Sequence, residues 1–526
     1  MSPASCRDAA ILVALTFAVF APTLSAEFVY DARLQILTDP FLHDPRNWFD
    51  VLSFRVLARD VLDFNRPVQL ASLMLDAAIW GREPFGYHLT SILLHCGNVV
   101  LLWLVIRDVF RRGPGGPAND PDCGRWPALL GAALFAVHPL VTEAVCEPTF
   151  REDLLVATFS LGAIVQAARM GGAGDLLPAA GSAVCCLLAV ASKESGIAAP
   201  VILAAYWWLF RRDESRRAWL TAIGGGAALV AVFVAARFLL EPSPSAIFES
   251  KPVYPGGSFA KAMEIEPRIL ALYAQLIVLP MNLCADYGMP NVAHLPLSLA
   301  LVILAAVATL LVIGGRADRR IAFGAALLVL PLVPVANLVP IYRAAADRYL
   351  YLPLAGVAVI VAALLDSRWL QGSPAPDSGS SLKRKQVALV GTLTALVALG
   401  LACMERQRIW ATQLALWQDT AARNPGSYTA AQGLAGALRE ADRLAEAEAA
   451  ARGALQLSSG QRGEAWASLA LVLDAQGRTT EADEAVAKAV EVDPRLEDPE
   501  ARVRILAMEA AEARELRRLL DRRSRR

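Results

Sequence analysis

A few charged side chains stand at the ends of the apolar runs of this chain, where they could act on a substrate held at a membrane surface. Asp31 lies in the segment 27–33, EFVYDAR, directly after the first apolar run. A carboxylate there can take a proton from a hydroxyl group as a general base. Arg151, Lys193 and Arg348 stand at comparable boundaries and could bind a phosphate or pyrophosphate head group. The alternatives are a solvated loop charge for Asp31 and interfacial snorkelling for each cation.

Further polar residues at such boundaries are candidates for substrate binding: His88, His138, Glu143 and Asp286. His88 and His95 share one helical face, but their spacing corresponds to about 10 Å along a helix axis. That is too far for a simple chelate, so we expect a packing or substrate-lining role. These residues form no compact ligand spacing that predicts a metal site, and a divalent cation as cofactor stays open.

Composition places the chain among integral membrane proteins. Its 526 residues are 56% hydrophobic and only 19% charged, with a mean hydropathy of +0.42, which is too apolar for an ordinary soluble domain. Lys plus Arg and Asp plus Glu number 50 each, so net charge gives no reason to expect a nucleic-acid partner. The eight cysteines are scattered without CxxC spacing, which indicates core packing rather than a metal site.

Twelve apolar runs have a length that could cross a bilayer. If all twelve crossed, the basic segments 316–320 and 383–385 would lie outside, against the tendency of Lys and Arg to stay in the cytoplasm. The run 268–283 is the weakest, because it follows Pro267 and contains Pro280, and we predict that it is interfacial or re-entrant. About eleven transmembrane helices remain, the first expected to be an uncleaved anchor rather than a signal peptide. The runs are 9–26, 86–107, 126–141, 153–169, 175–191, 195–210, 218–240, 268–283, 294–314, 321–341, 349–365 and 387–403.

This topology predicts which loops share a face. Four basic loops lie in the cytoplasm: 107–125, 211–217, 316–320 and 368–385. The loops on the outer face contain most of the unusual polar residues, and the chain after Cys403 lies there too. These outer loops are 27–85, 142–152, 192–194, 241–293 and 342–348.

The chain changes character near Met404, which divides it into a membrane domain, 1–403, and a soluble helical domain, 404–526. In the tail, DRLAEAEAAARGAL and GRTTEADEAVAKAV repeat at a spacing of 35 residues, which is typical of tetratricopeptide repeats (TPRs). We predict repeats at about 428–461 and 463–496, a preceding helix at 410–425 and a capping helix at 499–520. The fold class is therefore all-α, a membrane bundle followed by an α-solenoid that docks proteins or serves as a spacer.

The ordered set of motifs resembles the family of transmembrane and TPR-containing O-mannosyltransferases and its bacterial relatives. The segments that carry this resemblance are FVYDARLQIL (28–37), NRPVQLASLMLDAAIWGREPFGYHLTSILLH (65–95), FAVHPLVTEAV (135–145), SKESG (192–196) and DRYLYLP (347–353), followed by the repeats. The resemblance implies a GT-C glycosyltransferase fold and a polyprenyl-phosphate sugar as donor. It also implies that Asp31 is the catalytic acid of the first extracytoplasmic loop, used as general base, and that cations stabilise the departing lipid phosphate.

From these observations we predict an inner-membrane glycosyltransferase of bacterial type, with its TPR domain on the extracytoplasmic side. Its partners would be the lipid-linked donor, membrane lipid, and a protein or glycan acceptor presented by the repeats. The chain departs from the family pattern at Ala32, where a second acid is usual. That loss weakens a metal-bridging role more than a base role, and it leaves an inactive homologue open.

Two other classes of protein compete with this prediction. A non-catalytic membrane scaffold would use its TPRs to recruit envelope proteins. A transporter or flippase for lipid-linked sugars would favour polar residues deep within the spans. The predicted spans are apolar, with polarity at their outer ends, and this pattern favours a transferase that works at the membrane surface.

Overall fold

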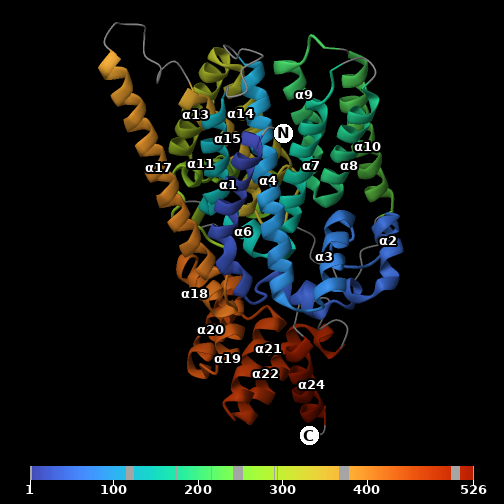
Figure 1. Cartoon of the computed structure of the whole chain (residues 1–526). Helices are drawn as coiled ribbons and strands as arrows, with labels where there is room; N and C mark the ends of the chain where they lie inside the picture. The colour runs from blue at the N-terminus through green and yellow to red at the C-terminus, as the bar shows by residue number, and fades with distance from the viewer. Residues whose placement is uncertain are drawn as a thin grey trace.

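The computed structural model describes residues 3–113, 124–171, 175–214, 216–240, 253–288, 291–292, 294–366, 378–498 and 510–524. Within these ranges the chain is helical or in turns, without a strand, so the predicted all-α class is confirmed. Figure 1 shows a bundle of long helices followed by a smaller group of helices, α18 to α24, below it.

The bundle contains a helix at each of the eleven predicted spans. Long helices form where the sequence is apolar on all sides, because a helix satisfies its own backbone hydrogen bonds away from water. The eleven are α1 (Pro3–Phe20), α4 (Pro84–Arg112), α5 (Arg125–Val137), α7 (Arg151–Ala168), α8 (Leu176–Ser192), α9 (Ala199–Phe210), α10 (Arg216–Leu240), α13 (Leu297–Ala317), α14 (Arg319–Val329), α15 (Tyr351–Asp366) and α17 (Ser378–Ile409). The weakest run, 268–283, lies mostly in α11 (Phe259–Val278).

Six helical segments in the described part of the chain are long and apolar enough to cross a membrane, or seven if one bent pair is a single span. The chain is therefore a multi-pass membrane protein, while the count of eleven crossings stays a prediction. The six are Ala4–Ser25, Pro84–Arg112, Arg216–Leu240, Leu297–Ala317, Asp347–Asp366 and Leu389–Ile409.

Prolines shorten two of the predicted spans. The run 126–141 ends its α-helix at Val137, and the chain bends by 51° before the next helical segment, which starts at Pro139. The run 321–341 ends its α-helix at Val329, before a 3-10 turn that contains Pro331 and Pro334. A proline residue lacks a backbone N–H donor, and its ring clashes with the preceding helical turn. Hydropathy alone therefore overestimates the length of these two helices.

The predicted grouping of loops is reflected in contacts at the two ends of the bundle. At one end, Arg112 pairs with Glu214 at 3.2 Å, and Arg320 pairs with Asp366. These contacts join loops that the charge pattern assigns to the cytoplasm.

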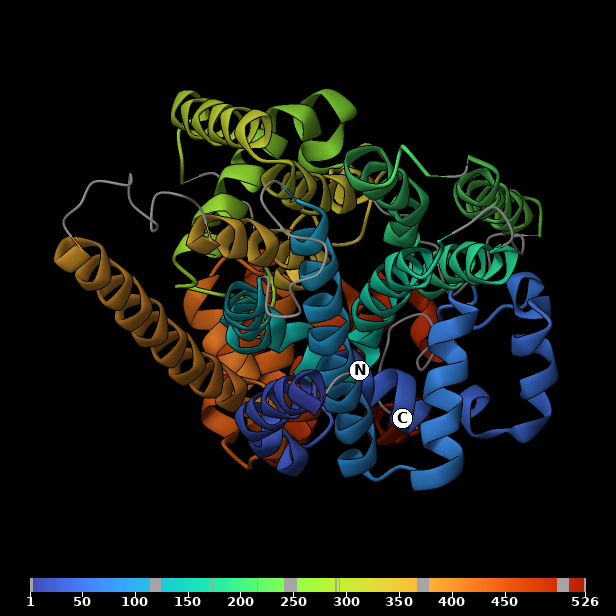
Figure 2. The ribbon, with the colours of Figure 1, turned by 45° about the horizontal axis from the view of Figure 1, so that its top comes forward.

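At the opposite end, Arg66 pairs with Glu194 at 3.2 Å, and these residues come from two predicted outer loops. The first outer loop contains the short helices α2 (Trp48–Leu52) and α3 (Pro67–Trp80). Figure 2 shows them at the side of the bundle, and α3 contacts α8.

The tail consists of paired helices that begin where α17 ends, at Ile409, a few residues beyond the predicted boundary. Its helices are α18 (Gln413–Arg423), α19 (Tyr428–Glu440), α20 (Leu444–Leu457), α21 (Gly463–Ala475), α22 (Thr479–Val492) and α24 (Ala510–Ser524). The pairs α19–α20 and α21–α22 lie at the two predicted repeats, with small buried residues where the helices meet, such as Ala435 and Ala447. Assignment of these pairs to the TPR class stays a prediction. Part of the predicted capping helix, 499–509, lies outside the described residues.

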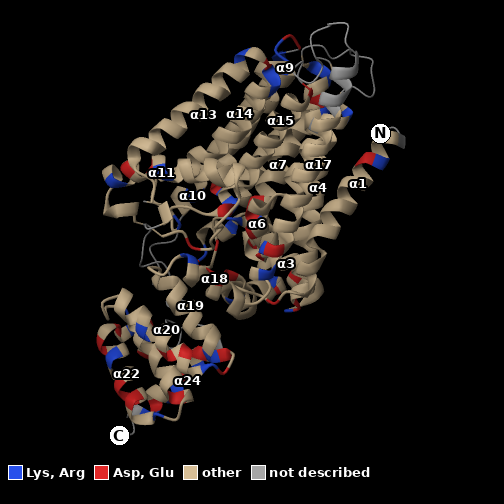
Figure 3. Cartoon of the chain, turned by 90° about the vertical axis from the view of Figure 1, so that its left-hand side faces the viewer, with Lys and Arg blue, Asp and Glu red and all other residues tan. Residues whose placement is uncertain are grey.

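The distribution of charge follows this division. Figure 3 shows few charged residues along the bundle helices, a group at the level of α6 (Thr142–Cys146) and α3, and many in the tail. The group near α6 and α3 lies where the bundle meets the tail.

Candidate functional site

Asp31 is an accessible carboxylate at the junction of the bundle and the tail. It follows Tyr30, whose backbone is in the left-handed region with φ of 53°, a conformation that costs a non-glycine residue free energy and is often found at functional sites. The side chain of Asp31 is exposed. Among the described residues it has no hydrogen-bond or ion-pair partner, so its oxygens are available to a substrate.

The protein environment makes Asp31 a stronger base than an ordinary aspartate. Loss of solvation raises the pKa of Asp31, because protein surrounds the carboxylate even though part of it is accessible. The positive charges of Arg343 and Arg348 lower this pKa, and the negative charges of Glu152 and Glu143 raise it. The net shift is upward, which favours proton acceptance from an acceptor hydroxyl.

Glu143 and Arg348, both predicted as substrate-binding residues, contact each other. The Glu143 carboxylate forms an ion pair with the Arg348 guanidinium, and it also accepts a hydrogen bond of 2.8 Å from the backbone N–H of Arg348. The guanidinium carbon lies 3.9 Å from the centroid of the Phe150 ring. Both charged side chains are buried, so the pair fixes Arg348 in one orientation near Asp31.

Lys193 belongs to a second charge network next to the first. Its ammonium pairs with Glu152 at 2.9 Å and with Asp153 at 2.6 Å, and it lies 5.1 Å from the centroid of the Tyr349 ring. Arg66 also pairs with Glu152. Two carboxylates therefore fix the Lys193 ammonium group, which also lies over the face of the Tyr349 ring.

Arg151 lies in a different environment from the other predicted cations. It forms an ion pair with Asp76 at 2.6 Å and donates a hydrogen bond of 2.8 Å to the backbone oxygen of Tyr87. Its side chain has no exposed surface. The guanidinium of Arg151 thus binds groups of α3 and α4 and is not directed toward a substrate. We therefore leave Arg151 out of the proposed donor site.

The three histidines discussed above are buried. His138 accepts a hydrogen bond from the Leu140 N–H at 3.3 Å and contacts the backbone oxygen of Ile277 at 3.1 Å, so it joins the bend after α5 to α11. His95 bonds to the Tyr351 hydroxyl at 2.7 Å, which fits the packing role expected for it. His88 lies beside Phe28, with the ring centroids 6.3 Å apart. Phe28 precedes Asp31 by three residues in the chain.

Asp286 connects the site to the tail. Its carboxylate pairs with Arg343 and accepts a hydrogen bond from Ser427, while its backbone oxygen accepts one from Asn424 at 2.8 Å. Arg343 in turn lies over the Tyr30 ring, 5.9 Å from its centroid. The structure thus brings Asp286 to the edge of the Asp31 site through Arg343.

Two residues near Asp31 escaped sequence reasoning. Arg343 has the largest lowering effect on the pKa of Asp31, and its position five residues before Arg348, at the same boundary, was an available signal. Glu147 is fully buried, and burial together with the charge of Asp31 raises the pKa of Glu147 well above its ordinary value. One of its oxygens accepts a hydrogen bond of 2.7 Å from the Thr149 hydroxyl. No motif in the sequence marked it.

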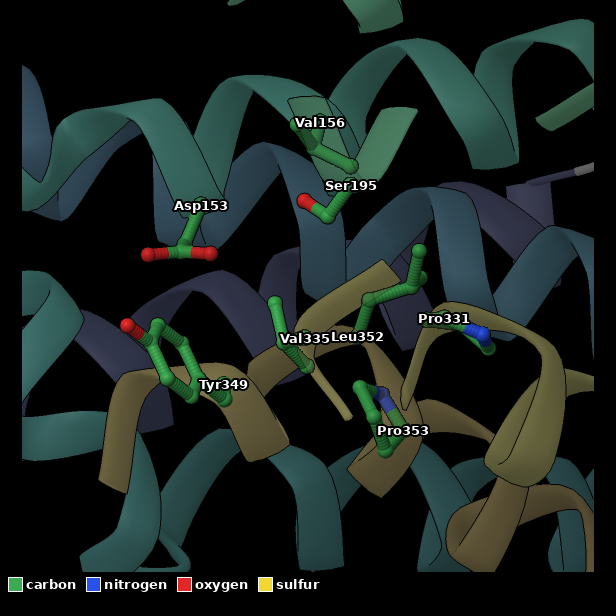
Figure 4. Close-up of a pocket in the computed structure, with 8 residues that line it drawn as sticks. All are labelled: Asp153, Val156, Ser195, Pro331, Val335, Tyr349, Leu352 and Pro353. Atoms are coloured by element: carbon green, nitrogen blue, oxygen red, sulfur yellow. The ribbon is translucent and has the colours of Figure 1, made fainter. Parts of the chain in front are cut away.

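A narrow pocket lies beside Lys193, between α7, the 3-10 segments η8 (Glu194–Ala198) and η11 (Leu330–Val335), and the start of α15. Figure 4 shows the polar groups of Asp153, Ser195 and Tyr349 toward one side, with apolar side chains toward the other. Its lining residues are Asp153, Val156, Ser195, Pro331, Val335, Tyr349, Leu352 and Pro353.

The described residues contain no group of three or more His, Cys, Asp or Glu side chains placed to hold a metal ion. Several acids of the site are instead paired with Arg or Lys, as in Glu143–Arg348 and Asp153–Lys193.

Fold and site together define a multi-pass, all-helical membrane protein with an exposed carboxylate and fixed cations at the junction with its tail. No family model matches the chain. The resemblance predicted from the motifs is nevertheless confirmed, because its curated relatives are protein O-mannosyl-transferases. It is 34% identical to Tmtc1 of Drosophila melanogaster over 146 residues, which are 27% of this chain and 16% of that protein. It is 24% identical to a Caenorhabditis elegans protein O-mannosyl-transferase over 373 residues, 68% of this chain and 51% of that protein.

The chain thus spans about half or less of the length of these two relatives. Among solved structures, it is similar to an oligosaccharyltransferase of Archaeoglobus fulgidus tethered to an acceptor peptide. That similarity has 13% sequence identity and a TM-score of 0.35, and covers 84% of this chain and 58% of the other. A score of this size does not establish a shared fold.

Proposed function

We propose that this protein is a GT-C glycosyltransferase that moves a sugar from a polyprenyl phosphate to a hydroxyl group of a protein or glycan. The observation that carries the proposal is Asp31, an exposed carboxylate without a hydrogen-bond or ion-pair partner in the described part of the chain, whose pKa is influenced by Arg343 and Arg348. A base beside fixed cations is the arrangement that sugar transfer from a phosphate needs. The names of its relatives support the same reaction class.

In the proposed reaction, Asp31 takes the proton of the acceptor hydroxyl. The hydroxyl oxygen forms a bond to the anomeric carbon of the sugar, and the bond between that carbon and the phosphate oxygen breaks. The electron pair of the broken bond leaves with the lipid phosphate. Arg343, which is partly exposed, and Arg348 would stabilise the charge that develops there.

We place the donor lipid along the residues that line the narrow pocket beside Lys193. Apolar residues such as Leu352 and Pro353 would contact the first prenyl units, and Lys193 at the polar side would attract the phosphate. The donor head would then lie between this pocket and the cations near Asp31.

The proposal places Asp31 and the tail on the extracytoplasmic face of a bacterial inner membrane. The charge pattern of the loops supports this orientation, and the Arg66–Glu194 contact between two predicted outer loops supports a shared face. The helical tail, as a TPR solenoid, would present the acceptor. A divalent cation would act, if required, together with the donor phosphate.

Purified protein incubated with a panel of polyprenyl-phosphate sugars and an acceptor mixture tests the proposal. Wild type should transfer a sugar, and Asp31→Asn should reduce the rate by about 100-fold or more. Equal transfer by both proteins would remove Asp31 as base. If neither protein transfers a sugar from any donor, and Asp31→Asn leaves cellular phenotypes intact, a membrane scaffold is the better description.

A further inference from the structure

The segment before Asp31 is hydrogen-bonded to the start of the tail. The Glu27 N–H donates a hydrogen bond of 3.1 Å to the backbone oxygen of Ala411. The Gln413 N–H donates one of 2.7 Å to the Glu27 carboxylate. The side-chain oxygen of Gln413 accepts a hydrogen bond of 3.0 Å from the Tyr30 N–H. Three hydrogen bonds between segments almost 400 residues apart in the chain thus fix the residues that lead into Asp31.

Aromatic packing holds the strained residue next to Asp31. The Tyr30 ring is stacked on Trp417 of α18, with centroids 5.3 Å apart and planes 25° apart. It also meets Trp410 edge-on at 6.3 Å. Because a left-handed backbone is unfavourable for a residue other than glycine, the surrounding contacts must hold Tyr30 in this conformation. Most of these contacts come from the tail.

The residues after Asp31 are held by the tail as well. Arg33 forms two parallel hydrogen bonds to Glu440 at the end of α19, of 2.9 and 2.7 Å. This paired geometry is more specific than a single contact. Asp31 therefore lies between two attachments, Tyr30 to α18 and Arg33 to α19.

A glycine couples these two tail helices at the same point. A Cβ added to Gly433 of α19 would lie 2.3 Å from the Trp417 indole, so the ring can rest on α19 only because this residue has no side chain. The contact sequence from α19 to the site is then Gly433, Trp417, Tyr30 and Asp31. A shift of α19 is transmitted to Asp31 through one packed ring pair.

We infer that α18 and α19 position the general base, with Gln413, Trp417 and Glu440 as positioning residues. The tail then does more than hold the acceptor, because the geometry of Asp31 depends on it. An acceptor that packs against α19 would be coupled to the reacting carboxylate without touching it. This inference rests on the proposed transferase function, which it deepens.

Two substitutions with matched controls test the inference in the full-length protein. Gly433→Ala should displace Trp417, whereas Gly453→Ala in α20 meets no atom within 4 Å. Gln413→Ala removes the acceptor of the Tyr30 N–H, whereas Gln418→Ala changes an exposed residue of the same helix. Both test variants should lower kcat by about 10- to 100-fold, since misplacement of a reacting group by about 1 Å has effects of this size. The KM for the lipid-linked donor should change less than about twofold, and the controls should match wild type.

A second readout does not depend on turnover. Carbodiimide reacts with protonated carboxyl groups, so labelling of Asp31 against pH, measured by mass spectrometry, reports its environment, with Asp31→Asn as the blank. We expect the labelling midpoint in Gly433→Ala and Gln413→Ala to move to lower pH, because a released loop gives Asp31 more water. The charge exchange Arg33→Glu with Glu440→Arg should restore kcat relative to either single change.

The outcomes separate the two hypotheses. If wild type transfers no sugar but the midpoint shifts in the two variants, the positioning role holds and the transferase proposal fails. If wild type is active and both kcat and the midpoint are unchanged in the variants, the positioning role is overturned. Should Gly433→Ala fail to fold, Gln413→Ala decides the matter, since it removes a single hydrogen bond.

Discussion

Arg348 and Glu143 form a buried ion pair that joins two loops 205 residues apart in the chain and places a fixed cation near Asp31. The pair contributes to the site in two ways. The Glu143 carboxylate binds Arg348 at both its backbone N–H and its guanidinium, and Arg348 in turn lowers the pKa of Asp31. Stability and function can be separated at this pair by substitution.

Glu143→Ala should destabilise the protein by about 3 kcal/mol or more, because it leaves the Arg348 charge buried without a partner. The double substitution Glu143→Leu with Arg348→Met should recover much of this loss, since an apolar pair of similar size avoids the desolvation cost. Thermal unfolding in detergent measures both. Transfer activity should be lost in the double variant, because the cation is gone. A double variant as unstable as the single one would argue against a buried pair.

Arg343→Gln should move the acid limb of the pH profile of kcat/KM to higher pH. The positive charge of Arg343 lowers the pKa of Asp31, so its removal raises that pKa further, and a higher pH is needed to ionise the base. In wild type the limb should already lie above the value of about 3.9 for an ordinary aspartate. Arg343→Lys keeps the charge and should leave the limb near its wild-type position. A limb that moves to lower pH in Arg343→Gln contradicts this electrostatic account.

Lys193→Met and Arg151→Met should differ in their effects. Lys193 is buried and paired with Glu152 and Asp153, so its loss should lower the unfolding temperature as well. Because Lys193 also lies beside the pocket, its loss should in addition raise the KM for a polyprenyl-phosphate sugar about 10-fold, or about 1.4 kcal/mol. Arg151 is fully buried with Asp76, so its replacement should lower the unfolding temperature with little change in donor KM. Steady-state kinetics with varied donor, alongside thermal unfolding, distinguishes the two. The reverse pattern would restore Arg151 to the donor site.

Val335→Trp should block the opening of the narrow pocket at its apolar side and weaken the use of long-chain donors. Val335 lines the pocket, whereas Val333 in the same 3-10 turn is 47% exposed and does not line it, so Val333→Trp is the control. Competition between a long-chain polyprenyl phosphate and a short-chain analogue provides the measurement. The preference for the long chain should fall in Val335→Trp alone. Equal preference in wild type and Val335→Trp would place the lipid elsewhere.

The sequence predicted the elements of this fold better than their ends. Period and hydropathy located a helix at each predicted span, because these signals are local. Pro139 and Pro331 shortened two spans, and α17 continued past Met404 to Ile409, because backbone chemistry rather than hydropathy ends a helix.

The site was predictable as a set of residue types but not as a set of partners. Asp31, Glu143, Arg348 and Asp286 were recognised from motifs, and the structure brings them to one region. The sequence could not show that Arg151 pairs with Asp76, since both belong to comparable polar boundaries. The pairing of each acid with its cation depends on packing between distant segments. One sequence alone carries no information about that packing.

The role of Asp31 as the base of a sugar transfer can be tested by comparing wild type and Asp31→Asn in transfer from a polyprenyl-phosphate sugar. Both proteins should bind the donor with similar affinity, since the substitution removes a proton acceptor and leaves the cations in place. We expect transfer by wild type and a rate at least about 100-fold lower for Asp31→Asn. Transfer at the wild-type rate by Asp31→Asn would contradict it.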